Sequence, residues 1–169
     1  MDRTGQGEQN CINASVNARR CFLAATSFCA LTIGLSGSVM GQTSTETIDT
    51  IPQPSDPNDG AFMERAFMLR QQAIDLGDQG YGAVVVRDNV IIGQSSSRVI
   101  LDQDPTGHAE MAAIRDAARR LNDRDLSGAV LYSSSRPCPM CEAAAFWSSV
   151  GQMFYGREIK SAGSPKLRG

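Results

Sequence analysis

Two short motifs that stand far apart in the chain constrain this sequence more than any other feature. The first is His108-Ala109-Glu110, and the second is Pro137-Cys138-Pro139-Met140-Cys141. His108 is the only histidine in the 169 residues, so any site that needs an imidazole has to use it. Two thiolates at positions i and i+3 lie on one face of a helical turn, where both can reach a single ion. We therefore expect a fold that brings the two motifs together.

A metal site built from these motifs has three protein ligands. His108, Cys138 and Cys141 supply one nitrogen and two sulfurs, a donor set that suits zinc. A closed structural zinc site would need a fourth Cys or His, and none follows residue 42. Three ligands leave a position for water, as in a catalytic site. We predict one Zn²⁺ per chain, with Glu110 beside that water as the group that moves protons.

Other interpretations of the cysteine pair stay open. A Cys-x-x-Cys pair can be redox-active, and in an exported protein it can be a simple disulfide. A thioredoxin-type pair would follow the first strand and would leave His108 and Glu110 unexplained. A zinc-stabilised domain without catalytic activity is the remaining alternative.

The motifs and their neighbours resemble a known superfamily. Residues 104–115 and 136–147 are similar to the zinc-binding segments of the cytidine and deoxycytidylate deaminases, and residues 82–86 to the family's first strand. The similarity is greatest to the branch that holds guanine deaminase, cytosine deaminase and tRNA adenosine deaminase, and it covers about residues 60–157. The resemblance implies the four roles given above, a homodimer or larger assembly, and hydrolytic release of ammonia from a nucleobase or nucleoside.

The residues around the motifs favour a small free base as substrate. Cys-Pro-Met-Cys followed by Phe146-Trp147 resembles guanine deaminase, and a net charge of −2 without a basic run argues against a nucleic-acid partner. We expect a guanine-type base, with cytosine or adenosine as the alternative. The candidate substrate-binding residues are Ser97, Ala109, Ser135 and Trp147. Trp147 could stack on a base, or it could pack between helix and sheet.

Three positions depart from the family pattern. Ser97 stands where the family often has an asparagine that contacts the substrate, and Arg136 stands where it usually has a glutamate. Gly80-Tyr81-Gly82 replaces the common Pro-Phe-Gly. Each change touches the substrate pocket and leaves the zinc chemistry intact.

The hydrophobic pattern predicts an α/β fold. Helices are expected over residues 62–76, 104–121 and 137–150, and strands over 81–86, 90–93, 129–133 and 152–155, with a turn at Asp88-Asn89. This order predicts a three-layer α-β-α sandwich with one mixed sheet, the cytidine deaminase-like arrangement. Relatives continue with another strand and one or two helices. We therefore expect a domain that is truncated at its C-terminus and leaves a strand edge unpaired.

Residues 1–42 have the pattern of an export signal. Arg19-Arg20-Cys21-Phe22-Leu23 precedes an uncharged, mainly apolar run over residues 24–40. Twin arginines in this position resemble a twin-arginine signal, which exports folded proteins. Ser, Thr and Gly interrupt the run, which argues against a stable membrane anchor; an anchor and a misassigned start remain the alternatives. We predict a flexible linker over residues 43–58, a deaminase domain over 59–169, and a periplasmic or secreted location.

Overall fold

The computed structural model describes residues 50–167. The expected export signal and the first part of the expected linker lie outside the described residues. The described elements are, in chain order, α1 (Asp59–Asp75), β1 (Gly82–Arg87), β2 (Val90–Ser96), α2 (Ala109–Leu121), β3 (Val130–Ser133), α3 (Pro139–Trp147), β4 (Gln152–Tyr155) and β5 (Lys160–Gly163). In this part of the chain, no helix has the length and apolar character needed to span a membrane.

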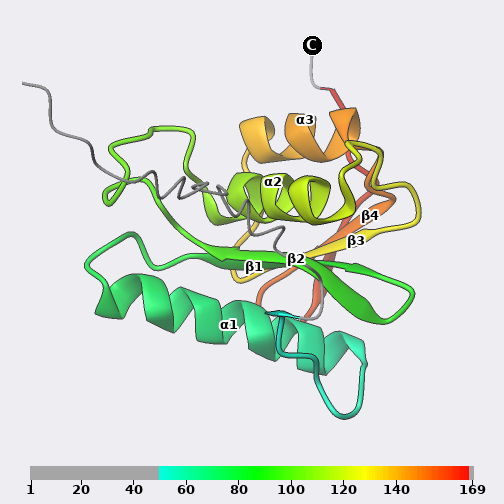
Figure 1. The fold of residues 1–169 in the computed structure, drawn as a ribbon, viewed down its shortest axis with the longest axis horizontal. Coiled ribbons are helices and arrows are strands. Elements are labelled where there is room, and N and C mark those ends of the chain that lie inside the picture. The colour runs from blue at the N-terminus through cyan, green and yellow to red at the C-terminus, as the bar shows by residue number, and fades with distance from the viewer. Residues whose placement is uncertain (1–49, 168–169) are drawn as a thin grey trace, which may run out of the picture. The chain divides into compact units, whose positions relative to one another are not determined.

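The five strands form one mixed sheet in the order β2-β1-β3-β4-β5. Strand β1 is antiparallel to both of its neighbours, β3 is parallel to β4, and β4 is antiparallel to β5. Helix α1 covers one face of the sheet, and α2 and α3 lie on the other (Figure 1). The predicted three-layer α-β-α sandwich with a mixed sheet is therefore confirmed.

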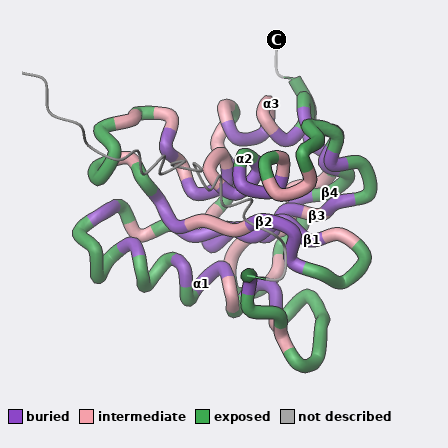
Figure 2. Tube along the Cα trace, in the orientation of Figure 1, coloured by how far each residue is buried: buried purple, intermediate pink, exposed green. Residues whose placement is uncertain are grey.

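The hydrophobic core lies on both faces of the sheet. Along β1, Val84 and Val86 pack with the apolar side of α1, whereas Ala83 and Val85 pack with that of α2. This alternation follows from the two-residue period of a strand, and it makes β1 a buried central strand. The buried residues run along the strands and along the facing sides of the helices (Figure 2).

Glycines let both helix layers approach the sheet closely. A Cβ at Gly93 of β2 would lie 2.5 Å from the backbone nitrogen of Ala117 in α2. A Cβ at Gly82 of β1 would lie 2.2 Å from the carbonyl oxygen of Ala66 in α1. No side chain fits at these distances, so the two glycines set how near the helices can pack. Gly93 thereby fixes the height above the sheet of α2, the helix that follows His108.

Helix α2 begins at Ala109 and not at Asp104, where the sequence predicted it. The Asp104 carboxylate accepts hydrogen bonds from the Thr106 backbone nitrogen at 2.8 Å and from the Thr106 hydroxyl at 2.7 Å. These bonds close a separate turn, because a short acidic side chain competes well for nearby backbone donors. The helix starts only after this turn, and His108 becomes its N-cap residue.

The strand β5 was not predicted from the sequence, which indicated four strands. It has only four residues, Lys-Ser-Ala-Gly, none of them β-branched or aromatic. A short polar edge strand of this kind carries no hydrophobic period by which to recognise it. It pairs with β4, so the edge of β4 that was expected to stay open is covered.

The segment over residues 50–58 differs from the expected flexible linker. Ile51 is only 3% exposed. The Gln53 side chain accepts a hydrogen bond from the Ile91 backbone nitrogen at 2.8 Å and donates one to the Ile91 carbonyl at 3.0 Å. An amide side chain can bond the free backbone N–H and C=O of an edge strand as a neighbouring strand would. Here the Gln53 amide does this for the backbone of Ile91 in the edge strand β2. The segment is therefore part of the folded domain.

Candidate metal centre and active site

The two sequence motifs meet at the N-termini of two helices on the same face of the sheet. His108 is the N-cap residue of α2, and Cys138 is the N-cap residue of α3. Pro139 occupies the first turn of α3, where its fixed φ and missing N–H suit a helix start. Cys141 follows within the first turn. The positive end of the α3 dipole lies beside both cysteines and favours their thiolate form, whereas burial and neighbouring charges act in the opposite direction at Cys141.

The three donor atoms form a nearly equilateral triangle. The Cys138 Sγ lies 3.6 Å from the Cys141 Sγ and 3.6 Å from the His108 Nδ1. The distance from the Cys141 Sγ to the same nitrogen is also 3.6 Å. A tetrahedral zinc ion with ordinary bond lengths to sulfur and nitrogen separates its ligand atoms by about 3.6–3.8 Å. The residues therefore fit zinc as they stand, and they form the one group of this kind that residues 50–167 contain.

Glu110 lies beside this triangle, and each of its carboxylate oxygens contacts a different side chain. The side chain is 5% exposed. Its Oε1 accepts a hydrogen bond of 2.8 Å from the Ser133 hydroxyl, and its Oε2 lies 3.6 Å from the Cys141 Sγ. Glu110 is not one of the three ligands. A fixed carboxylate next to a metal position, but outside the ligand set, is placed to act as a general acid and base.

The environment of Cys141 disfavours a free thiolate. Burial, together with the negative charges of Glu110 and Cys138, raises the pKa of the Cys141 thiol. A cation bound at the triangle reverses this balance, and its binding releases the thiol proton. The position of the His108 Nδ1 at 3.6 Å from both sulfurs favours a metal site over a redox-active dithiol.

The predicted substrate-binding residues have different surroundings. Ser97 is fully buried, and its hydroxyl donates a 2.7 Å hydrogen bond to Asp78. Ala109 is the first residue of α2 and is fully buried in the core on the α2 side of the sheet. Ser135 is half-buried next to the metal-ligand loop, and its backbone nitrogen donates to the Ser133 hydroxyl at 3.4 Å. The structure thus places Ser135 near the site and turns the Ser97 hydroxyl toward Asp78.

Trp147 lies at the other end of α3 from the metal ligands. Its position in the helix is about 13 Å from Cys138 along the helix axis. The indole is 67% exposed and makes an edge-to-face contact with Phe146, with 5.5 Å between the ring centroids. The structure therefore does not gather Trp147 with the metal site of the same chain, nor does it pack this side chain between helix and sheet.

Asp78 is a residue whose role the sequence did not indicate. Its carboxylate accepts the Ser97 hydroxyl and the backbone nitrogens of Ile100 at 3.0 Å and Leu101 at 2.9 Å. Burial alone would raise the pKa of Asp78, but these hydrogen bonds and one from the Gln79 backbone lower it below its ordinary value. Asp78 therefore pins the start of the loop that leads from β2 to His108.

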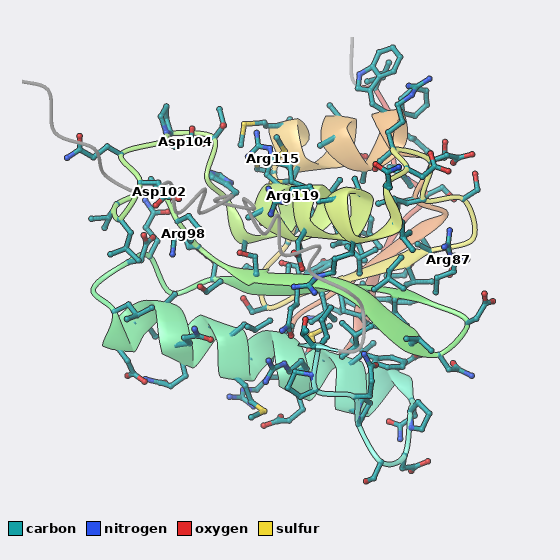
Figure 3. The ribbon with its side chains drawn as sticks, in the orientation of Figure 1. Arg87, Arg98, Asp102, Asp104, Arg115 and Arg119 are labelled. Atoms are coloured by element: carbon teal, nitrogen blue, oxygen red, sulfur yellow. The ribbon has the colours of Figure 1, made fainter. Side chains whose placement is uncertain are left out.

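The same loop carries more acidic than basic charge. Arg98 binds the Asp102 carboxylate through Nη2 at 2.6 Å and Nε at 3.0 Å. Asp104 lies further along the loop, and Arg115 follows on α2 (Figure 3). Arg136 follows β3, and its guanidinium lies 5.9 Å from the centroid of the Tyr155 ring at the end of β4. The loop beside the candidate metal centre is thus an ion-paired surface and not a basic one.

The fold and the site together define a class of protein. A mixed sheet that carries a His-Cys-Cys donor set on two helix N-termini, with a buried glutamate beside it, is the framework of the zinc-binding nucleobase and nucleoside deaminases. The chain belongs to the cytidine and deoxycytidylate deaminase zinc-binding family, whose sequence pattern matches residues 56–157.

Individual relatives of the chain carry different names. It is 39% identical over 106 residues to a guanine deaminase of Bacillus subtilis, which covers 62% of this chain and 68% of the relative. It is 36% identical over 104 residues to a tRNA-specific adenosine deaminase of Buchnera aphidicola, covering 62% and 64%. The X-ray structure of the Bacillus subtilis guanine deaminase matches with a TM-score of 0.57 and 38% identity, covering 59% of this chain and 64% of that one. The chain thus spans about two thirds of the length of these relatives.

Proposed function

We propose that the protein is a zinc-dependent hydrolase that removes an amino group from a nucleobase or nucleoside as ammonia, with a guanine-type base as the preferred substrate. The observation that carries this proposal is the triangle of three donor atoms, 3.6 Å apart, with the Glu110 carboxylate against it. A metal-ligand set and a proton carrier outside it are the two parts that hydrolytic deamination needs.

Three residues would bind the metal, and a fourth would transfer protons. His108, Cys138 and Cys141 would hold zinc, which when bound supplies a Lewis acid that lowers the pKa of water toward neutrality. Glu110 Oε2, the oxygen on the Cys141 side, takes a proton from the attacking water and gives it to the ring nitrogen next to the reacting carbon. A carbon–oxygen bond forms. Glu110 then takes the second proton from the newly bonded hydroxyl and passes it to the amino group, and the carbon–nitrogen bond breaks as the carbon–oxygen bond becomes a carbonyl, so that ammonia leaves.

A small base suits this chain better than tRNA for electrostatic reasons. Binding to a nucleic acid depends on Lys and Arg side chains that neutralise phosphates. The formal net charge of this protein is −2, and the loop before His108 contains one Arg and two Asp. The similarity to a guanine deaminase supports a free purine base, and the similarity to a tRNA-specific enzyme makes tRNA the alternative to test.

A substrate panel tests the proposal. The zinc-loaded protein is incubated with guanine, cytosine, adenine, their nucleosides and tRNA, and ammonia is measured, with Glu110→Ala as the control. We expect ammonia from guanine above all other compounds, and a loss of at least a hundredfold in the variant, in line with the contribution of general acid–base catalysis, about 10²–10⁴-fold. Zinc binding without ammonia from any compound would instead identify a non-catalytic zinc domain.

We also propose export through a twin-arginine route. Arg19-Arg20 and the apolar run after them support it, and a lysine pair in place of the arginines should keep the protein out of the periplasm in a fractionation experiment.

We further propose that the protein forms a homodimer. The exposed Phe146–Trp147 pair on α3 supports this, since large exposed aromatic side chains are common at interfaces. Light scattering of the purified protein should give twice the chain mass.

A further inference from the structure

We infer that Ser133 is the positioning residue for Glu110, and that it selects Oε2 as the oxygen that exchanges protons during the reaction. This inference rests on the proposed function. It concerns a contact between β3 and α2 that joins residues 23 positions apart in the sequence, and Ser133 belongs to neither of the two metal-ligand motifs.

The backbone of Ser133 is held on both sides. It is the last residue of β3, and it pairs with Ala83 of β1 and with Tyr155 of β4. Ser133 has the same orientation as Leu131 two residues earlier, so its side chain faces the layer of α2 and α3. The residue is fully buried. The hydroxyl is therefore presented to Glu110 from a rigid strand, which fixes its position better than a loop residue could.

The hydrogen-bond pattern also fixes the direction of the hydroxyl. A serine has one hydrogen to donate and lone pairs to accept with. The Ser135 backbone nitrogen donates to the Ser133 oxygen at 3.4 Å, and the Ser133 hydroxyl donates to Glu110 Oε1 at 2.8 Å. Because the Ser133 hydroxyl donates its hydrogen to Oε1, it holds this oxygen of the Glu110 carboxylate in place. The other oxygen, Oε2, faces the Cys141 sulfur at 3.6 Å.

The hydrogen bond matters because the end of a glutamate side chain rotates easily. Its last torsion is broad, so packing alone does not fix the orientation of the carboxylate relative to the metal position. Without the Ser133 hydroxyl, Oε1 is left buried and unsatisfied, and the carboxylate can turn away from the productive orientation. The consequence is a slower proton transfer with unchanged metal ligands and an unchanged substrate pocket.

The kinetic test compares Ser133→Ala with Ser133→Thr in the zinc-loaded full chain. A hydrogen bond to a charged group is strong enough that its loss should lower kcat roughly tenfold or more. The zinc content and the KM for the base should not change, and the threonine variant, which keeps a hydroxyl, should recover most of kcat. A serine that only fills space would give the opposite pattern, because alanine would then be as active as the wild type.

A second measurement does not depend on turnover. Thermal unfolding is compared for the wild type, Ser133→Ala, Glu110→Ala and the double variant. If the two side chains interact, the double variant should lose less in Tm than the sum of the single losses. Ser134→Ala provides a matched control, because the neighbouring Ser134 hydroxyl accepts from the Gly82 backbone nitrogen at 3.1 Å and has no bond to Glu110. Its Tm loss should add to that of Glu110→Ala.

The two measurements separate this inference from the proposed function. Additive Tm losses for Ser133 and Glu110 would overturn the positioning role even if the protein releases ammonia. Non-additive losses in a protein that releases no ammonia would support the contact and reject the enzyme assignment. A Ser133→Ala variant with full kcat would also overturn the role.

Discussion

At the scale of single residues, each candidate ligand stands at the start of a helix, which helps to fix where its donor atom lies. His108 and Cys138 are the N-cap residues of their helices, and Cys141 stands one turn into α3. All three therefore lie at the start of a helix, where the helix backbone helps to set their positions. The zinc site should therefore be largely formed before the metal binds, and each ligand should be needed for tight binding.

Removal of one ligand tests this directly. In Cys138→Ala, two donors remain, and the metal content of the purified protein should fall from one zinc per chain to well below one. The variant should also unfold at a lower temperature, because metal binding contributes to folding stability. Metal analysis by mass spectrometry checks the prediction, and Ser135→Ala, next to the ligand loop, is the control that should keep its zinc. Full zinc in the Cys138 variant would show that the ligand set is wrong.

The sequence was sufficient to predict that His108, Cys138 and Cys141 come together, but not which residues support them. The motif spacing is local, since Cys138 and Cys141 share one helical turn. The contacts of Ser133 with Glu110 and of Asp78 with Ser97 join residues 23 and 19 positions apart. Such contacts depend on strand pairing and loop closure, and neither serine nor aspartate carries a sequence signal for them. Ser97 was predicted to contact substrate, and in the structure its hydroxyl donates to Asp78.

At the scale of structural elements, the loop from Ser97 to His108 depends on Asp78. The charged carboxylate is the form that accepts the Ile100 and Leu101 backbone hydrogens. Because folding lowers the pKa of Asp78 below its ordinary value of 3.8, its stabilising contribution is complete above that value and is lost as the pH falls through the lower, folded pKa.

The variant Asp78→Asn should therefore be destabilised in a pH-dependent way. At pH 7 we expect a loss of about 1–3 kcal/mol, the usual cost of removing such hydrogen bonds. The difference from the wild type should shrink as the pH falls below 3.8, because the unfolded wild-type carboxyl takes up a proton there and the folded carboxyl does so at still lower pH. Thermal unfolding as a function of pH measures both effects. An equal difference at pH 3 and pH 7 would mean that the charge of Asp78 is not what holds the loop.

The close packing of α2 on β2 gives a second prediction at this scale. In Gly93→Ala the new Cβ would lie 2.5 Å from the Ala117 backbone nitrogen, so α2 has to move away from the sheet. Overpacking of this kind costs about 1–3 kcal/mol, and the displaced helix should also weaken zinc binding because His108 stands at its start. Gly151→Ala is the matched control, with its nearest contact at 3.5 Å. Similar unfolding temperatures for the two variants would contradict the packing account.

The boundaries of the elements show where local sequence signals suffice. The strand over residues 152–155 was predicted with its observed bounds, and the turn at Asp88-Asn89 has the positive φ angles of 53° and 62° that a tight hairpin needs. The start of α2 and the strand β5 were not predicted. In the first case Asp104 formed its own turn, and in the second a polar edge strand formed through pairing with β4.

At the scale of the whole molecule, the two faces of the sheet have different roles. Helix α1 covers one face and contributes to the core, and the other face carries α2 and α3, whose N-termini bring the candidate zinc ligands together (Figure 1). The order of the first seven helices and strands, from α1 to β4, could be predicted from hydrophobic periodicity. The height of α2 above the sheet, set by Gly93, could not, because it depends on the backbone of two elements in contact.

The most direct test of the central claim is a reaction of the zinc-loaded full chain with guanine in water labelled with ¹⁸O. We expect equal amounts of ammonia and of a product base in which a carbonyl oxygen from water has replaced the amino group. This exchange is a hydrolysis and involves no oxidation or reduction. Removal of zinc by a chelator, or Glu110→Ala, should abolish both products. The absence of ammonia and of ¹⁸O incorporation with guanine and with every other base, in a protein that holds one zinc per chain, would contradict the account.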